Sequence, residues 1–144
     1  MIPRYSLLTW NILNGSDSRL FGNNWLHRRN ALKTDLNEAQ PDIFCIQEAR
    51  LDQLKFVDDT LNGYSRLGVG RDDGKDRGEY CAIYIRDNNF EVQNQGTFWF
   101  SDTPDVSTST WDVYFKRICT WAKLTARTQA REFFVISVVI PLRN

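Results

Sequence analysis

Several features that would place a protein in a specialised class at once are missing from this sequence. Neither sign of charge is in excess, since 18 Lys and Arg residues balance 18 Asp and Glu residues. The chain therefore lacks the broad basic surface of a stand-alone nucleic-acid-binding protein, although a phosphate substrate fits this balance when a bound metal ion supplies positive charge. No segment has the roughly 18 apolar residues of a membrane-spanning helix. The first ten residues contain too short an apolar run for a signal peptide, so we expect a cytoplasmic protein.

Cysteine and histidine are also scarce. The three cysteines are Cys45, Cys81 and Cys119, an odd number without any Cys-x-x-Cys pair, and each lies between apolar neighbours. This arrangement favours buried, reduced thiols in strands over a disulfide framework or a zinc site. The single histidine, His27, lies beside Arg28 on a predicted helix, which favours a surface or helix-packing role over that of a catalytic base.

The pattern of apolar residues predicts a single α/β domain. Hydrophobic residues make up 42% and charged residues 25% of the 144 positions, a balance typical of globular proteins. The periodicity predicts helices over residues 25–39 and 51–61, the first capped by Asn23 or Asn24. It predicts strands over residues 5–10, 43–46, 80–85, 97–100, 118–124 and 133–140, with the first two buried. The first 63 residues thus alternate strand and helix, and the remaining predicted elements are all strands. This order indicates a mixed α/β sandwich.

Two polar residues stand at the ends of apolar strands. Asn11 directly follows the first predicted strand, and Glu48 lies just beyond the strand over residues 43–46. If these strands are neighbours, both side chains lie at the sheet edge where α/β proteins place ligands. A carboxylate and an amide oxygen suit a hard cation such as Mg²⁺. The alternative, from spacing alone, is that both are ordinary turn or helix-capping residues.

Arginine and tryptophan side chains are further candidates for contact with a substrate. Arg71, Lys75 and Arg77 could bind phosphates, but the acidic residues interleaved with them equally favour a solvated loop with internal ion pairs. Three tryptophans, Trp99, Trp111 and Trp121, are predicted to pack in the core or on a sheet instead of stacking on bases.

A series of short motifs has the order and spacing of a known protein family. The motifs lie at residues 8–11, 41–48, 68–74, 78–84, 96–104, 111–112 and 117–122. Together they resemble a bacterial-type branch of the endonuclease/exonuclease/phosphatase family over residues 5–135. That family includes deoxyribonucleases, abasic-site endonucleases, inositol-phosphate phosphatases and deadenylases. The resemblance implies a four-layer α/β sandwich, with two sheets face to face and helices outside, and a phosphate-ester substrate, nucleic acid among the options.

The resemblance also implies roles for three residues, which we take as the candidate catalytic set. It implies that Glu48 binds the catalytic Mg²⁺, with Mn²⁺ as the alternative ion, and that Asn11 helps to hold the metal or the phosphate. Glu79 would lie in a strand that runs beside the site. The alternative for Glu79 is an exposed carboxylate at a strand end, paired with Arg77.

Residues 136–144 depart from the family pattern. The family would continue there with an Asn-Thr-His motif, followed by an Asp-x-Asn motif and a closing Asp-His pair, whereas this sequence reads Ile136-Ser137-Val138-Val139 and contains none of them. We therefore expect residues 1–144 to form one partial, truncated domain that supplies about one sheet with its covering helices. One face of that sheet would be apolar and open.

The expected function is metal-dependent hydrolysis of phosphodiester or phosphomonoester bonds, which covers both nucleases and phosphatases. Activity of this chain alone is expected to be weak or absent, because the missing His and Asp residues would activate the attacking water. The alternative is a non-catalytic remnant, a binding module or a split half. Such a half would need a partner chain, or would associate with itself through the open sheet face.

Overall fold

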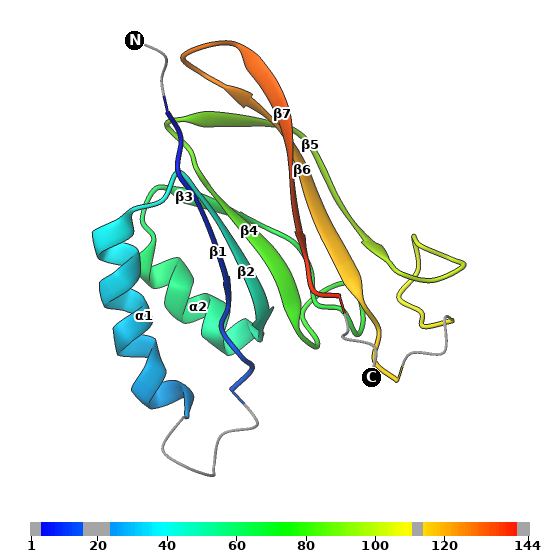
Figure 1. The fold of residues 1–144 in the computed structure, drawn as a ribbon. Coiled ribbons are helices and arrows are strands. Elements are labelled where there is room, and N and C mark those ends of the chain that lie inside the picture. Colours follow the sequence, from blue (N-terminus) through cyan, green and yellow to red (C-terminus); the bar gives the residue numbers. More distant parts are fainter. Residues whose placement is uncertain (1–3, 16–23, 111–113, 141–144) are drawn as a thin grey trace.

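Helices and sheets lie in stacked layers in the computed structural model of the chain, which describes residues 4–15, 24–110 and 114–140 (Figure 1). Within these ranges there are two helices, α1 (Trp25–Ala39) and α2 (Leu51–Thr60). The strands are β1 (Leu7–Asn11), β2 (Ile43–Ala49), β3 (Tyr64–Leu67), β4 (Tyr80–Arg86), β5 (Phe90–Trp99), β6 (Ile118–Ala126) and β7 (Arg131–Val138). They form two sheets with the strand orders β1-β2-β4-β3 and β5-β6-β7.

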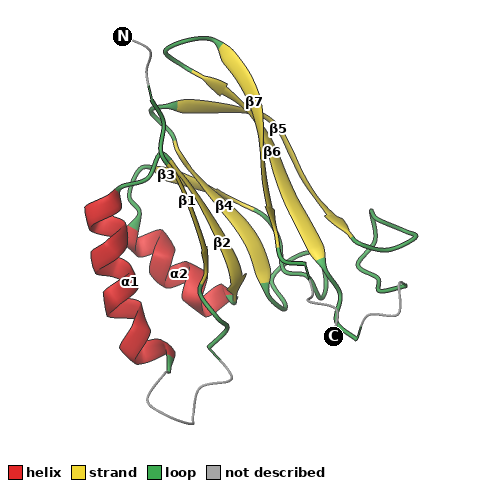
Figure 2. Ribbon diagram, viewed as in Figure 1, coloured by secondary structure: helices red, strands yellow, loops and turns green. Residues whose placement is uncertain are grey.

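The first sheet is mixed and carries both helices on one face (Figure 2). Strands β1 and β2 are parallel neighbours, whereas β4 pairs antiparallel with both β2 and β3. On the helix side, Phe44 and Ile46 of β2 pack with Tyr84 of β4 against Leu36 of α1 and Leu54 of α2. All five side chains are essentially inaccessible to solvent, so this layer removes a large apolar area from water.

The second sheet packs on the opposite face of the first. Ile43, Cys45 and Ile83 point away from the helices and contact Leu124 of β6 and Val135 of β7. This explains the uninterrupted apolar run of β2, since both faces of that strand are covered. The layer order of helices, first sheet and second sheet confirms the predicted mixed α/β sandwich.

The prediction that the chain supplies one sheet with an open apolar face is wrong. The chain folds β5, β6 and β7 over that face itself. The exposed apolar surface lies instead on the outer side of β7, where Phe134 and Ile136 are 62% and 60% exposed. Alternation along the strand places these two side chains outward and the buried Val135 and Ser137 inward.

Other expectations differ from the structure at the edges of the sheets. The predicted buried strand over residues 5–10 is an edge strand, β1, in which only Leu8 is partly covered, because β1 has a single neighbour. Strand β3 and the first part of β5 were not predicted. The first part of β5 is mostly polar, with Glu91, Gln93, Asn94 and Gln95. The alternation of apolar and polar residues that indicates a strand is therefore absent there.

Helix α1 and the cysteines confirm the corresponding predictions. The helix has the predicted bounds, and Asn24 caps it by accepting a hydrogen bond from the backbone N–H of His27 at 3.0 Å. His27 itself is exposed. All three cysteines are buried free thiols in strands. Asn23 and Trp111 lie outside the described residues. Neither helix within residues 4–15, 24–110 and 114–140 is long and apolar enough to cross a membrane.

Candidate functional site

Asn11 and Glu48 meet at one edge of the first sheet. Because β1 and β2 are parallel neighbours with Asn11 opposite Gln47, the ends of both strands lie side by side. The side-chain N–H of Asn11 donates a hydrogen bond of 2.8 Å to a carboxylate oxygen of Glu48. The sequence-based expectation that these two residues come together therefore matches the geometry. The amide oxygen of Asn11 is turned away and accepts from the backbone N–H of Leu13 at 3.0 Å.

A β-bulge sets the direction of the Glu48 side chain. The register between β2 and β4 shifts between Gln47 and Ala49, and Glu48 has a φ of 60°. This left-handed conformation costs a non-glycine residue about 1–2 kcal/mol, and bulges often re-aim a side chain beside a site. Gln47 anchors the bulge, because its side-chain N–H group contacts Thr9 and Ser137 at 3.1 Å each.

Glu48 faces a polar pocket of about 460 Å³, called here the Glu48 pocket. The residues that line it are Asn14, Glu48, Arg50, Arg71, Asp72, Gly78, Glu79, Phe115 and Arg117. They come from the loop after β1, the bulge of β2, the start of α2, the loop before β4 and the segment before β6. Three arginines and three carboxylates in one pocket make it suited to a charged ligand.

Glu79 lies in the wall of this pocket and forms two short hydrogen bonds. Arg71 donates to one carboxylate oxygen at 2.6 Å, and the side-chain N–H of Asn14 donates to the other, also at 2.6 Å. Only 16% of the Glu79 side chain and 14% of the Arg71 side chain are exposed. The alternative that Glu79 is an exposed residue paired with Arg77 is therefore wrong, and its partner is Arg71.

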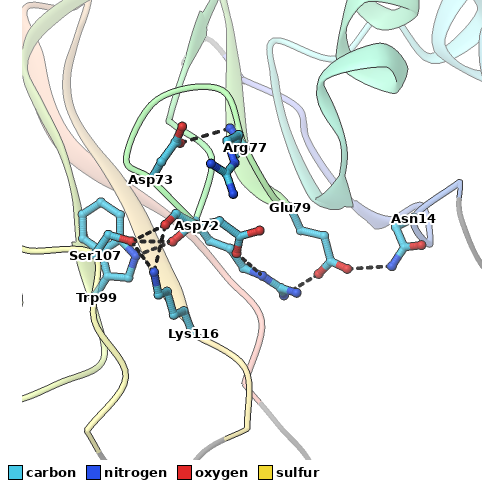
Figure 3. A network of polar contacts seen from close by, with 9 residues as sticks. Asn14, Asp72, Asp73, Arg77, Glu79, Trp99, Ser107 and Lys116 are labelled. Atoms are coloured by element: carbon cyan, nitrogen blue, oxygen red, sulfur yellow. Dashed lines mark hydrogen bonds and ion pairs between the residues drawn. The ribbon is translucent and has the colours of Figure 1, made fainter.

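The loop that carries Arg71 is held in place by Trp99 at the end of β5 and by Ser107 and Lys116 from the segment between β5 and β6 (Figure 3). The backbone carbonyl of Arg71 accepts hydrogen bonds from the indole N–H of Trp99 at 2.7 Å and the hydroxyl of Ser107 at 3.0 Å. Lys116 and Ser107 donate to the next carbonyl, that of Asp72, at 2.8 and 2.9 Å. Trp99 is thus buried as predicted and also fixes the backbone that presents Arg71.

Of the two predictions for residues 70–79, the solvated loop with internal contacts holds for a part of it, whereas phosphate binding by its arginines stays a prediction. Asp73 accepts hydrogen bonds from the backbone N–H groups of Arg77 and Lys75, which lower the pKa of its carboxyl, so this part has the internal contacts of a solvated loop. Arg71 turns into the pocket instead. The loop is tight, because a Cβ atom at Gly70 would lie 2.2 Å from the carbonyl oxygen of Arg77.

Sequence reasoning missed two residues of the pocket, Arg50 and Arg117. Arg50 stands two positions after Glu48, at the start of α2, and its nearness to Glu48 could have drawn attention to it. Arg117 reaches the pocket from just before β6. Its side-chain Nε is buried and has no hydrogen-bond partner within the described ranges.

The donor set of the pocket fits a weakly held Mg²⁺ or Mn²⁺ ion. Among residues 4–15, 24–110 and 114–140, no three His, Cys, Asp or Glu side chains converge as a complete metal-binding group. Glu48 supplies one carboxylate, and Asn11 orients it through a hydrogen bond. Mg²⁺ usually takes one or two protein carboxylates and completes its shell with waters and substrate phosphates, so Glu48 fits as a single protein anchor.

Comparisons with known proteins agree on one family. A family model described as the endonuclease/exonuclease/phosphatase family matches residues 8–140. The mannosyl-6-phosphatase of Bacteroides thetaiotaomicron VPI-5482 is 38% identical, with a TM-score of 0.85, over 92% of this chain and 50% of that one. An endonuclease/exonuclease/phosphatase from Bacteroides vulgatus is 32% identical, with a TM-score of 0.87, over 93% of this chain and 51% of that one.

A more distant relative matches over nearly the whole chain. Nocturnin of Drosophila melanogaster is 24% identical, and the match covers 96% of this chain and 23% of that protein. The catalytic domain of human Nocturnin, at 19% identity and a TM-score of 0.73, shares the fold. The chain spans about half the length of the solved structures that it matches.

Proposed function

Since the chain belongs to the endonuclease/exonuclease/phosphatase family, we propose that the Glu48 pocket binds a phosphate ester and takes part in its metal-dependent hydrolysis. The observation that carries the proposal is that Glu48, which Asn11 holds by a hydrogen bond of 2.8 Å, lies in the wall of a pocket that also contains three arginines. Arginine side chains suit the recognition of phosphate oxygens, because their planar N–H groups can donate in pairs.

In this proposal Glu48 holds Mg²⁺ or Mn²⁺, and Asn11 positions the Glu48 carboxylate. A bound ion supplies positive charge that polarises a phosphoryl oxygen and stabilises the leaving oxyanion. The role of Glu79 is to position Arg71, since its two carboxylate oxygens are occupied by Arg71 and Asn14. Asn11, Glu48 and Glu79 thus have three different tasks at one pocket.

A metal-binding measurement tests this assignment without requiring turnover. Binding of Mn²⁺ to the 144-residue chain, followed by electron paramagnetic resonance, should be lost in Glu48→Gln, which keeps the shape of the side chain and removes its charge. Asn11→Ala should weaken binding about 10-fold, as expected when a residue that orients a ligand is removed. Glu91→Gln is the matched control, because Glu91 is an exposed carboxylate of β5 outside the pocket. Equal Mn²⁺ binding by Glu48→Gln and Glu91→Gln would contradict the proposal.

Hydrolysis is tested with two chromogenic esters, p-nitrophenyl phosphate and bis(p-nitrophenyl) phosphate, with Mg²⁺ or Mn²⁺. Hydrolysis that disappears in Glu48→Gln and persists in Glu91→Gln supports an active site in this chain. The 38% identical relative is a mannosyl-6-phosphatase, which favours the monoester, whereas preference for the diester would favour the nuclease alternative.

The second candidate function is that of a half that needs a partner chain. The chain spans about half the length of the solved structures that it matches, and the exposed Phe134 and Ile136 on the outer face of β7 give a surface for a partner or a second copy. This candidate predicts Mn²⁺ binding without hydrolysis. It also predicts a concentration-dependent increase of the sedimentation coefficient that is reduced in Ile136→Lys, while a monomer at all concentrations would argue against self-association.

A further inference from the structure

The Glu48 pocket has one apolar side chain in its otherwise polar lining. Within the described ranges that side chain is Phe115, and it is 53% exposed. The neighbouring Tyr114 is 95% exposed, and the centroids of the two rings lie 5.0 Å apart. A single exposed aromatic ring needs no explanation, whereas two adjacent rings beside a polar pocket are typical of a ligand-binding surface. Phe115 and Tyr114 are called here the aromatic pair.

A fixed guanidinium group lies over the Phe115 ring. The Cζ atom of Arg71 is 5.4 Å from the ring centroid, within the range of a cation–π contact. Arg71 is itself held, because Glu79 accepts a hydrogen bond of 2.6 Å from its side chain and Trp99 donates to its backbone carbonyl. The Phe115 ring therefore rests on a well-anchored part of the pocket wall, although more than half of it is open to solvent.

The chain that follows the aromatic pair is also fixed. Lys116 donates to the carbonyl of Asp72 at 2.8 Å and to the hydroxyl of Ser107 at 3.0 Å (Figure 3). The carbonyl of Arg117 accepts a hydrogen bond of 2.9 Å from the backbone N–H of Phe100. A ring that is held in place before a ligand arrives loses less conformational entropy on binding, so the aromatic pair is suited to hold a ligand.

The two rings stand nearly perpendicular to each other, at 80°. A flat ligand ring that stacks on one of them is therefore close to perpendicular to the other, and both arrangements are favourable between aromatic rings. A saturated ring or an alkyl chain lacks the π-face on which this preference depends. The aromatic pair thus fits a planar aromatic ring, such as a nucleobase, since every base has a π-face.

We propose that the aromatic pair binds a planar aromatic ring of the phosphate ester, so that the substrate class of the Glu48 pocket is a nucleotide or another aryl-bearing phosphate ester. The proposal rests on the proposed function for the phosphate end of the ligand and extends it to the organic end. Phe115 determines the specificity, because it lines the pocket, and Tyr114 adds a second ring beside it.

Two pairs of ligands test the proposal, and within each pair the phosphate group is the same. AMP and ribose 5-phosphate differ in the adenine ring, whereas phenyl and cyclohexyl phosphate differ in the flatness of the ring. Each is titrated in EDTA, so that neither metal binding nor hydrolysis affects the result. In isothermal titration calorimetry, AMP should bind at least about 10-fold more tightly than ribose 5-phosphate, as expected for one stacked base. The adenine H2 and H8 signals should move upfield in ¹H NMR spectra, because these protons lie over an aromatic ring.

Four variants locate the effect. Phe115→Leu keeps an apolar side chain and removes the ring, so it should weaken AMP binding about 10-fold and leave ribose 5-phosphate within about 2-fold. Tyr114→Leu should weaken AMP binding about 3-fold, since Tyr114 is not part of the pocket lining. Phe115→Trp keeps a π-face and should retain the preference for AMP, which separates loss of the ring from a disturbed fold. Phe134→Leu is the matched control, because this 62% exposed phenylalanine of β7 lies outside the pocket.

The outcomes separate this proposal from the proposed function. A preference for AMP that persists in Phe115→Leu, equal effects of Phe115→Leu and Phe134→Leu, or no saturable binding of AMP would each overturn it. A ring preference in both ligand pairs would support aryl esters in general, and a preference confined to AMP would support nucleotides. Ring-dependent binding in a chain that neither binds Mn²⁺ through Glu48 nor hydrolyses an ester would support this proposal and refute the proposed function. Metal-dependent hydrolysis without any preference for a ring would do the reverse.

Discussion

The ion pair between Arg71 and Glu79 should couple strongly to the stability of the fold. Each side chain is only about one-sixth exposed, at 14% and 16%, and their atoms approach to 2.6 Å. Removing one partner of a fully buried pair costs about 3–5 kcal/mol, and the residual exposure reduces this to about 2–3 kcal/mol for Arg71→Met, because water screens the remaining charge. Glu79→Gln should cost about 2 kcal/mol, since Asp72 and solvent partly compensate Arg71.

The double variant should cost much less than the sum of the two single variants. Replacing both charges leaves no buried charge without a partner, so Arg71→Met with Glu79→Gln should cost about 1–2 kcal/mol, which gives a coupling energy of about 2–4 kcal/mol. Urea unfolding followed by tryptophan fluorescence measures these free energies. The pair of Lys123 and Glu132, also close at 2.8 Å but 33% and 54% exposed, is the control cycle. Its coupling should stay below about 1 kcal/mol, and similar coupling in both cycles would refute the reasoning.

Three further predictions concern backbone space, a buried hydroxyl and a buried thiol. Gly70→Ala should destabilise the fold by about 3 kcal/mol, because its Cβ would lie 2.2 Å from a backbone carbonyl oxygen and open two or three hydrogen bonds of the loop. Gly63→Ala, with a φ of 79° but free space around it, should cost only about 1–2 kcal/mol, and equal urea midpoints would contradict this difference. Tyr84→Phe should cost about 1–2 kcal/mol, since the hydroxyl donates at 2.8 Å to a carboxylate of α2, whereas Tyr114→Phe at a 95% exposed position should cost nothing measurable in the same assay. Burial raises the pKa of the Cys81 thiol from 9.0 to about 12, so its contribution to stability is complete below pH 9.0 and declines as the pH rises toward the folded value. The urea midpoint should therefore fall between pH 9.0 and about 12, and less steeply in Cys81→Ala; parallel curves would contradict this assignment.

Elements with a strong local pattern could be predicted from the sequence. Helix α1 has an apolar face and an asparagine cap, and both of its ends were predicted correctly. Strand β2 was predicted from its continuous apolar run, although the predicted end at Ile46 missed the bulge that extends it to Ala49. Strand β3 and the polar half of β5 have no comparable signal, because polar and exposed residues interrupt their apolar positions and pairing with β4 and β6 places them in the sheets.

Only the part of the candidate site that lies at the ends of two neighbouring strands could be predicted from the sequence. Asn11 and Glu48 could be brought together by the argument that adjacent strands end at one sheet edge. Arg117 could not, because it reaches the pocket through the stacking of the second sheet on the first, and sheet stacking has no local sequence pattern. The partner of Glu79 was missed for a related reason, since the tight turn of the loop brings Arg71 and not Arg77 against its carboxylate.

The bulge at Glu48 has a consequence for any attempt to make this chain more robust. A glutamate held at a φ of 60° stores strain of about 1–2 kcal/mol that glycine at the same position would not have. A screen that rewards thermal resistance alone would therefore favour Glu48→Gly, and would select against the side chain that gives the pocket its proposed metal anchor. Glycine at position 48 would raise thermal stability, whereas the proposed metal binding requires glutamate there. A stabilisation programme for this chain therefore has to keep Glu48 unchanged.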